Sequence, residues 1–257
     1  LPRWDGISRF LEKIIPELAS DYKITVIAPK FKGQAPKIKN VRIIRLPTHH
    51  FYLGDYMPSR VNFHNYKIIK REVKKADLIW TQSLGPIGMK TIISAKIKKK
   101  KVISYIHSLE TELFSKSIEL RPFIRKIFFN IIKVMSRFFY NLCTLLIVPS
   151  LDLTEILTWY KIKTKKVVVH MGIDTEHFKP TFEKAVEKTK IGIRDKIIIG
   201  YSGRIAHEKD LLTLYRAFTR LHHKYNVKLL IVGGGLPHLK RFLKNKKDII
   251  VTGSVDN

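Results

Sequence analysis

The chain has 257 residues, of which 45% are hydrophobic, and its 49 Lys and Arg against 21 Asp and Glu give a formal net charge of +28. This apolar content can bury one or two cores, which excludes a disordered or fibrous protein. The positive excess suits nucleic acid, anionic lipid or a phosphorylated substrate as partner, and equally a lysine-rich proteome, in which case it carries no functional information.

The single cysteine, Cys143, cannot form an internal disulfide or, by itself, a structural zinc site, so the cytoplasm is the expected compartment. The most apolar region, residues 122–148, is interrupted by four charges: Arg125, Lys126, Lys133 and Arg137. No stretch therefore reaches the roughly 18 uncharged residues of a membrane span. Residues 1–6 carry charge and turn formers where a signal peptide has an apolar segment.

Apolar runs alternate with segments of helical spacing, a pattern typical of a parallel sheet covered by helices. The first predicted helix has an apolar face formed by Ile7, Phe10, Leu11, Ile14, Ile15 and Leu18. Pro16 lacks a backbone donor and is expected to kink or shorten the last turn. Six strands are predicted next, at residues 23–28, 41–46, 77–81, 102–107, 145–149 and 167–170.

The polar, lysine-rich segment at residues 175–190 contains Pro180 and is predicted to be a linker. The alternation then restarts, with strands at 196–200, 228–232 and 249–252 and helices at about 208–221 and 239–243. The sequence therefore predicts two α/β domains, an N-terminal one over residues 1–178 and a partial C-terminal one over residues 179–257.

Several well-known motifs are absent from the sequence. Gly233-Gly234-Gly235 is followed by Leu236-Pro237-His238, which does not fit the dinucleotide pattern G-x-G-x-x-G, and the chain has no G-x-x-x-x-G-K-[ST] phosphate loop. It also has no H-E-x-x-H, C-x-x-C or D-x-D, so no metal site is expected. Any phosphate would have to be bound by side-chain cations and backbone amides.

Two such cations, Arg204 and Lys209, lie between a predicted strand and a predicted helix. This position is the carboxyl edge of the second sheet, where ligands bind in open α/β sheets. A guanidinium fork, a compact ammonium and the amides of a helix N-terminus together suit a diphosphate. In so basic a chain, both side chains can also be ordinary solvated charges.

Gly203-Arg204, followed by Lys209 and an amphipathic helix, resembles the G-R-x-x-x-x-K-G signature of the retaining glycosyltransferases of family four. Other segments resemble further motifs of that family in the same order. These are residues 2–6 (the P-x-x-G-G loop), 104–107 (a strand ending in histidine), 145–150 (a strand closing in serine), 169–174 with Phe178 and Pro180 (P-N-G-V-D and F-x-P) and 231–237 (G-D-G). The resemblance covers nearly the whole chain.

This resemblance implies the GT-B fold, in which two Rossmann-like domains with parallel sheets face each other across a cleft, here with the second domain incomplete. It implies transfer of a sugar from a nucleotide-sugar donor to an acceptor, such as a lipid-linked sugar or a polysaccharide, with retention of the anomeric configuration. Arg204 and Lys209 would stabilise the departing diphosphate without a metal or another cofactor. His107 would hydrogen-bond the donor sugar, unless it is simply a hydrogen-bonded histidine at a strand end.

Gly6 and Gly235 complete the donor-binding residues that the resemblance implies. Gly6 would let the backbone at the first helix's N-terminus approach the donor phosphate, although an ordinary turn glycine is the alternative.

The sequence also departs from the family pattern. Asp5 stands where the family usually has a second glycine, which places a carboxylate near the expected phosphate site. The other departures are His170 and Met171 for Pro-Asn, Asp210 for the glycine after the lysine, and Gly234 for an acidic residue. The resemblance places a first strand before Leu1 and a donor-binding E-x-x-x-x-x-x-x-E segment beyond Asn257, so the chain as given is expected to be an inactive fragment.

A helix predicted at residues 121–142 has a polar stripe formed by Lys126, Asn130, Lys133, Arg137 and Asn141. Largely opposite lie Ile124, Phe128, Ile131, Met135 and Phe138. Such a helix suits contact with an anionic membrane through Lys126, Lys133 and Arg137, which would hold the protein on the inner face of the membrane near a lipid-linked acceptor. Alternatively, the apolar face packs into the core of the first domain.

Two other functions stay open. The charge of +28 suits a non-enzymatic nucleic-acid-binding protein, but the chain has no nucleic-acid-binding motif and no nucleic acid is expected as a partner. The second alternative is a sugar-nucleotide epimerase with the same fold.

Overall fold

The computed structural model describes residues 6–31, 33–50, 57–60, 62–117, 121–176, 178–180, 188–189, 192–193 and 196–255, without the side chains of 114–117. The chain divides into two compact units, Leu1–Gly172 and Ile173–Asn257. The predicted domain boundary after residue 178 lies slightly downstream of this division.

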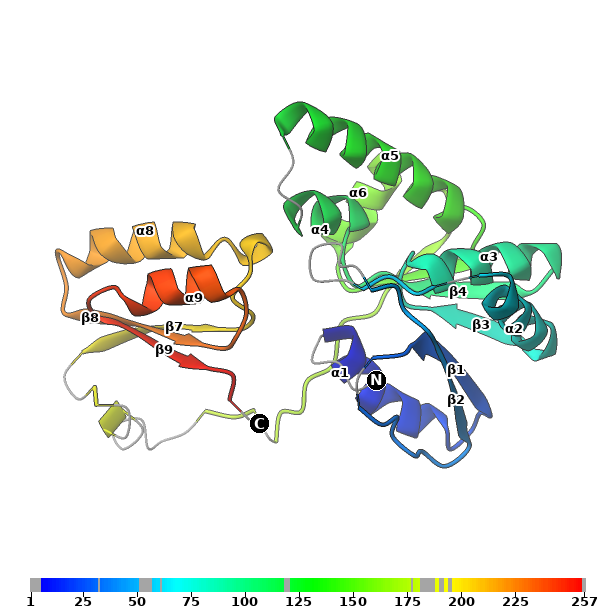
Figure 1. Cartoon of the computed structure of the whole chain (residues 1–257), viewed down its shortest axis with the longest axis horizontal. Coiled ribbons are helices and arrows are strands. Elements are labelled where there is room, and N and C mark those ends of the chain that lie inside the picture. The colour runs from blue at the N-terminus through cyan, green and yellow to red at the C-terminus, as the bar shows by residue number, and fades with distance from the viewer. Residues whose placement is uncertain are drawn as a thin grey trace. The chain divides into compact units, whose positions relative to one another are not determined.

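Unit 1 contains two parallel sheets (Figure 1). The first pairs β1 (Ile24–Pro29) with β2 (Val41–Leu46). The second follows chain order through β3 (Leu78–Thr81), β4 (Lys101–Tyr105), β5 (Leu145–Val148) and β6 (Lys166–Val168). Its helices are α1 (Gly6–Leu18), α2 (Phe63–Lys75), α3 (Pro86–Ile97), α4 (Glu110–Ser117), α5 (Pro122–Tyr140) and α6 (Leu151–Trp159). In the four-stranded sheet, helical crossovers bring successive strands into parallel alignment, as the alternating sequence predicts.

The core of unit 1 joins the four-stranded sheet to its helices. Ile92 of α3, Leu146 of β5 and Tyr140 of α5 are fully buried in one cluster. Because Tyr140 is the last residue of α5, this cluster fixes the carboxyl end of that long helix against the sheet.

Two details of unit 1 differ from the sequence-based predictions. Helix α1 continues two residues beyond Pro16, to Leu18, so the last turn is not shortened at the proline. The amides of Ala19 and Tyr22 still donate to helical carbonyls, at 2.9 Å each, so the helical bonding resumes directly after the proline. Strand β4 ends at Tyr105, and His107 therefore lies in the following loop instead of in the strand.

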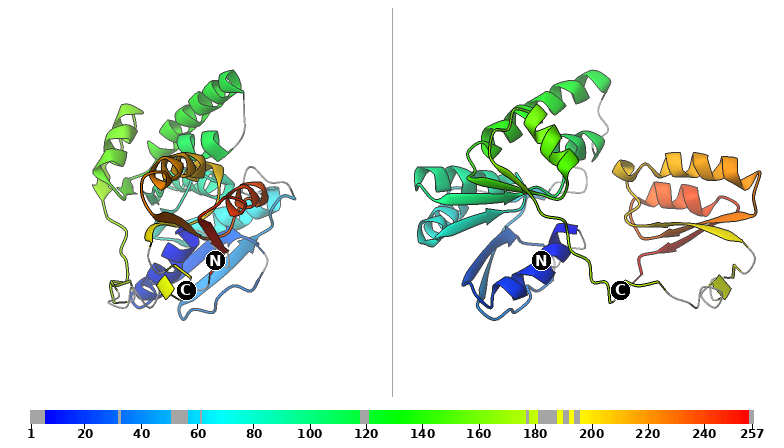
Figure 2. Two further views of the ribbon diagram at one scale, coloured as in Figure 1. Left: turned by 90° about the vertical axis from the view of Figure 1, so that its left-hand side faces the viewer. Right: turned by 180° about the vertical axis from the view of Figure 1, so that it is seen from behind.

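Unit 2 has one parallel sheet in the order β7 (Ile197–Ser202), β8 (Val227–Val232) and β9 (Ile249–Gly253). Helices α8 (Leu211–His222) and α9 (Pro237–Lys244) lie on the same face of this sheet (Figures 1 and 2). Every second residue of β8 is buried, with Leu229 and Ile231 packed against Phe218 of α8. This period-two burial is the expected result of covering one face of a sheet.

The helix predicted at residues 208–221 begins later, at Leu211, and a short 3₁₀ helix, η1 (His207–Lys209), precedes it. Within the described ranges, no helix combines the length and the apolar character needed to cross a bilayer.

Candidate functional site

His107 lies beyond β4 in a cluster formed by β3, β4 and α1. Its Nε2 is 2.8 Å from Oε1 of Gln82, which follows β3. Its ring stacks on Tyr105 with the centroids 4.4 Å apart, and the Phe10 ring of α1 meets it edge-on at 5.2 Å. An amide oxygen can only accept, so in this arrangement the proton of the neutral imidazole lies on Nε2.

Gly6 is the first residue of α1, one turn before Phe10, so the N-terminus of α1 belongs to the same part of unit 1 as His107. A Cβ at Gly6 would meet no described atom within 4 Å, and the φ of Gly6 is not in the left-handed region. Packing against the described residues and backbone conformation therefore give no reason for a glycine at this position. Asp5 and the rest of the loop at residues 2–5 lie outside the described residues.

Other family-like residues of unit 1 have local structural roles. Ser150, which closes the segment after β5, caps α6, and its Oγ accepts from the amide of Leu153 at 3.3 Å. Nδ1 of His170 is 2.9 Å from the carbonyl oxygen of Pro149. Tyr105 donates to the carbonyl of Val169 at 3.2 Å, and burial raises the pKa of its hydroxyl. These bonds tie the carboxyl ends of β4, β5 and β6 together.

In unit 2, the loops after β7 and β8 run side by side. The amide of Ile205 donates to the carbonyl of Gly234 at 2.8 Å, and the amide of Leu236 donates back to Ile205 at the same distance. A Cβ at Gly235, whose φ is 152°, would lie 2.1 Å from the carbonyl oxygen of Ile205. Gly235 is thus required for the close approach of the two loops, whatever it contributes to donor binding.

Arg204 lies on the loop after β7, and Lys209 is the last residue of η1. The Arg204 guanidinium forms an ion pair with the carboxylate of Glu208, and the Tyr201 hydroxyl donates to the Arg204 carbonyl at 2.8 Å. The side chains of Arg204 and Glu208 are 37% and 13% exposed, and Lys209 is exposed. The structure therefore brings Arg204, Lys209 and Gly235 to adjoining loops of unit 2, while Gly6 and His107 belong to unit 1.

Asp210 explains one departure from the family signature. Its backbone is left-handed, with φ and ψ both 46°, a conformation that glycine adopts freely and that aspartate tolerates better than most residues. Its carboxylate also caps α8, where Oδ1 accepts from the amide of Thr213 at 3.4 Å. One amide of this helix start is therefore already bonded to a carboxylate.

Sequence reasoning missed Gln82 and Glu208. Gln82 directly follows an apolar strand at the edge where His107 was expected, which is a positional signal for it. Glu208 is four residues after Arg204, the spacing of an ion pair along a helical turn.

Helix α5 has three faces. One packs into unit 1 through Ile132, Ser136 and Tyr140, all buried. The second is the polar stripe with Lys126 and Arg137. The third is an exposed apolar stripe, formed by Phe123, Ile124, Ile127, Ile131, Val134 and Phe138.

This arrangement corrects the predicted apolar face of the helix. Ile124, Ile131 and Phe138 are exposed, whereas Phe128 and Met135 are half-buried, so that face does not pack into the core as a whole.

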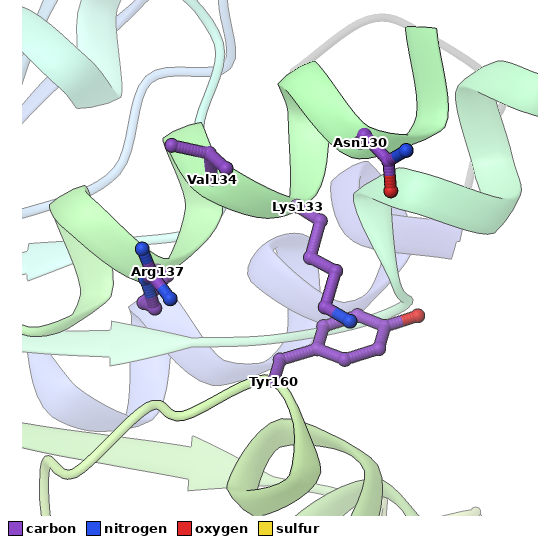
Figure 3. A pocket seen from close by; sticks show the side chains of 5 residues that line it. All are labelled: Asn130, Lys133, Val134, Arg137 and Tyr160. Carbon is purple, nitrogen blue, oxygen red and sulfur yellow. The ribbon is translucent and has the colours of Figure 1, made fainter. Parts of the chain in front are cut away.

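Lys133 extends from α5 toward the end of α6 (Figure 3). Its Nζ lies 4.8 Å from the Trp159 ring centroid and 4.7 Å from that of Tyr160. The lysine lines a depression of about 250 Å³ together with Asn130, Val134, Arg137 and Tyr160. Lys126 and Arg137 are exposed, while Lys133 is half-buried over aromatic rings.

Two family models match the chain. The model of Glycosyltransferase Family 4 matches residues 4–177, and that of Glycosyl transferases group 1 matches residues 196–257.

Two curated relatives align with 99% of the chain. One is the alpha-monoglucosyldiacylglycerol synthase of Streptococcus pneumoniae, which is 24% identical. The other is the GDP-mannose-dependent alpha-(1-6)-phosphatidylinositol monomannoside mannosyltransferase of Mycolicibacterium smegmatis, which is 23% identical. The alignments span 58% and 63% of these two proteins.

Solved structures share the fold. Sucrose-phosphate synthase from Thermosynechococcus elongatus superposes with a TM-score of 0.68 at 15% identity, over 98% of this chain and 66% of that one. HepE from Anabaena, in complex with UDP and glucose, gives a TM-score of 0.65 at 12% identity, over 99% and 67%. These likenesses confirm the predicted GT-B class with Rossmann-like parallel α/β units, and the family model that matches residues 4–177 shows that the chain belongs to Glycosyltransferase Family 4.

Proposed function

We propose that this chain is part of a glycosyltransferase that moves a sugar from a nucleotide-sugar donor to an acceptor with retention of the anomeric configuration. The observation that carries the proposal is the Gly203-Arg204…Lys209 segment on the loop that pairs with Gly234 and Gly235. Both curated relatives are named as enzymes of glycosyl transfer or glycolipid synthesis, and the chain aligns with them over nearly all of its length.

Arg204 and Lys209 stabilise the leaving group in this proposal. As the bond between the anomeric carbon and the diphosphate breaks, negative charge grows on the diphosphate. Positive groups already in place lower the free energy of that transition state more than that of the bound substrate. Glu208 supports this role because its ion pair with Arg204 restricts the guanidinium before the donor binds.

The groups of unit 1 act on the donor at two points. The His107 imidazole hydrogen-bonds the donor sugar, and Gln82, Tyr105 and Phe10 hold its ring. The backbone at Gly6 approaches the donor phosphate, and among the described residues no atom lies within 4 Å of the place that a Cβ would take there.

Turnover needs no divalent cation, because Arg204 and Lys209 supply the positive charge that a metal ion gives to a bound phosphate in metal-dependent enzymes. Full activity in excess chelator is the expected result. Strict dependence on added magnesium or manganese would contradict this part of the proposal.

The acceptor is lipid-linked, and α5 holds the enzyme on the cytoplasmic face of an anionic membrane. Lys126 and Arg137 face outward beside the exposed apolar stripe of the helix. A basic stripe next to an apolar one matches the boundary between lipid headgroups and acyl chains.

The deciding experiment is a titration of the full-length protein with nucleoside diphosphates, and separately with single- and double-stranded nucleic acid, at several salt concentrations. Saturable diphosphate binding together with transfer of labelled sugar to a lipid extract supports the transferase. Tight nucleic-acid binding with a steep salt slope and no diphosphate binding would establish the nucleic-acid-binding alternative instead. An isomerised donor without a transfer product would identify an epimerase.

A further inference from the structure

Glu110 is a buried acid that the proposed reaction does not use. It begins α4, three residues after His107, and only 8% of its surface is exposed. The hydroxyl of Tyr140, the last residue of α5 and fully buried, donates to its Oε1. Burial raises the pKa of Glu110 despite this hydrogen bond.

Leu84 relates this contact to the loop that carries Gln82. Leu84 and Gln82 belong to the loop after β3, while Leu109 and Glu110 close the loop after β4, which carries His107. Leu84, Leu109 and Tyr140 are buried in one core cluster. The bond from Tyr140 to Glu110 therefore fixes the His107 loop to the cluster that also holds the Gln82 loop, and the bond of 2.8 Å between Gln82 and His107 links the two loops directly.

The chemistry of the Glu110–Tyr140 pair indicates a role other than stabilising the fold. A buried pair of ionisable side chains adds little to the free energy of folding compared with apolar side chains of similar volume. Loss of the hydrogen-bond donor would also leave a buried acid without a partner, which destabilises the folded state. Glu110 and Tyr140 are both too buried to reach a substrate, so a catalytic role does not account for them.

We propose that Glu110 and Tyr140 are positioning residues for His107, because they hold the Gln82 loop and the His107 loop at the spacing that orients the imidazole and fixes its tautomer. The proposal rests on the proposed role of His107 in glycosyl transfer. A positioned ring keeps its hydrogen-bonding nitrogen directed at the donor, and small losses of alignment in such sites reduce turnover steeply.

Tyr140→Phe tests this assignment, because it removes the donor and keeps the ring. Tyr160→Phe is the matched control: Tyr160 is also buried, and its hydroxyl contacts Thr111 of the same helix at 3.2 Å, one residue from Glu110. The readout is the set of His107 imidazole NMR shifts in this chain, assigned through a His107→Gln variant, with circular dichroism as the check on folding.

Tyr140→Phe should shift the His107 resonances while Tyr160→Phe leaves them in place. In the full-length protein, Tyr140→Phe should lower kcat about tenfold with little change in KM. Glu110→Gln, which keeps an acceptor oxygen, should retain more activity than Glu110→Ala.

Unchanged His107 resonances in folded Tyr140→Phe, or equal shifts in both tyrosine variants, would overturn the positioning role. If Tyr140→Phe does not fold, the same comparison is made with Glu110→Gln against Thr111→Val. Selective His107 shifts in a full-length protein without glycosyl transfer would support the positioning role and remove the proposed function, so the two failures are distinguishable.

Discussion

At the scale of single residues, Arg204 and Lys209 carry the proposed chemistry in different ways. Arg204 is restrained by Glu208 and is partly covered, whereas Lys209 is exposed on η1. A restrained arginine loses little freedom when it binds a diphosphate, while a lysine adds a mobile point charge.

Replacing Arg204 or Lys209 with alanine in the full-length protein should lower kcat by roughly 10²-fold, by analogy with the loss of one preorganised donor. Steady-state kinetics with labelled donor measures the change. Arg216→Ala, which removes an exposed arginine from α8, is the control and should leave kcat within about threefold of the unmodified enzyme. If the kcat of both Arg204→Ala and Lys209→Ala lies within the same threefold range as that of Arg216→Ala, neither Arg204 nor Lys209 belongs to the site.

Asp248 is the main charge contact at the opposite, amino-terminal edge of the sheet in unit 2. Its Oδ1 lies 3.0 Å from Nζ of Lys196 and 4.0 Å from that of Lys228, and its Oδ2 lies 3.4 Å from Nε2 of His222. The hydrogen bond from Lys196 is the largest influence that lowers the pKa of Asp248, and the nearby charges add to it against the effect of burial.

A lowered pKa means that the folded state favours the ionised carboxylate, so Asp248 contributes stability above its unfolded pKa of about 3.9. That contribution is lost as the pH falls through the lower, folded pKa. Asp248→Asn keeps a residue that tolerates the left-handed φ of 60° and removes only the charge. It should cost about 1.5–3 kcal/mol of unfolding free energy at pH 7.

Urea unfolding followed by circular dichroism from pH 7 to pH 3 measures this difference between the parent and Asp248→Asn. The difference should be constant at neutral pH and shrink below about pH 4. A difference that persists unchanged to pH 3 would show that the Asp248 charge is not its source.

At the scale of elements, α5 combines support for unit 1 with an outward surface. Tyr140 and Ile132 anchor it, and the apolar stripe lies beside the cationic one on the remaining surface. Lys133 is different from the other basic residues of the stripe, because its ammonium lies over the rings of Trp159 and Tyr160. The outward charges of the stripe are therefore those of Lys126 and Arg137.

The double variant Lys126→Gln with Arg137→Gln should weaken binding to anionic vesicles by about 2 kcal/mol if the contributions add, and should leave folding intact because both side chains are exposed. Co-sedimentation with phosphatidylglycerol vesicles measures the effect. Lys70→Gln with Lys74→Gln removes the same charge from exposed positions of α2 and is the control. Equal losses in both pairs, or none in the α5 pair, would refute membrane contact through this helix.

At the scale of the whole molecule, each unit has its own buried cluster, and the two clusters share no residue. The three tryptophans, Trp4, Trp80 and Trp159, all belong to unit 1. Tryptophan fluorescence therefore reports the unfolding of unit 1, whereas circular dichroism reports both units.

We expect two unfolding transitions, of which fluorescence follows only one. Leu229→Ala in β8 should destabilise unit 2 by about 2–5 kcal/mol and move only the transition that fluorescence does not see. Leu146→Ala in β5 should move the fluorescence transition instead. If the fluorescence and circular dichroism unfolding curves coincide, and each of the two variants shifts both curves, the chain unfolds as one cooperative unit.

The sequence by itself determined the parallel α/β organisation and the location of the proposed phosphate-binding segment. The bounds of strand 41–46 are predicted to the residue. An apolar run between turn formers can be recognised from neighbouring residues alone, and such a run forms a strand whose apolar side chains are at least partly buried. The spacing of Gly203, Arg204 and Lys209 can likewise be read from neighbouring residues. This segment lies directly after β7, because β7 ends at Ser202, where the apolar run of the strand ends.

Only the tertiary structure decided which groups meet across long separations in the chain. The bonds between Gln82 and His107 and between Glu110 and Tyr140 join residues 25 and 30 positions apart, and no periodicity in the sequence records such pairs. The buried face of α5 is another case. Its apolar residues extend over more than half of the helix surface, so the side that enters the core is chosen by packing against the sheet and its neighbouring helices.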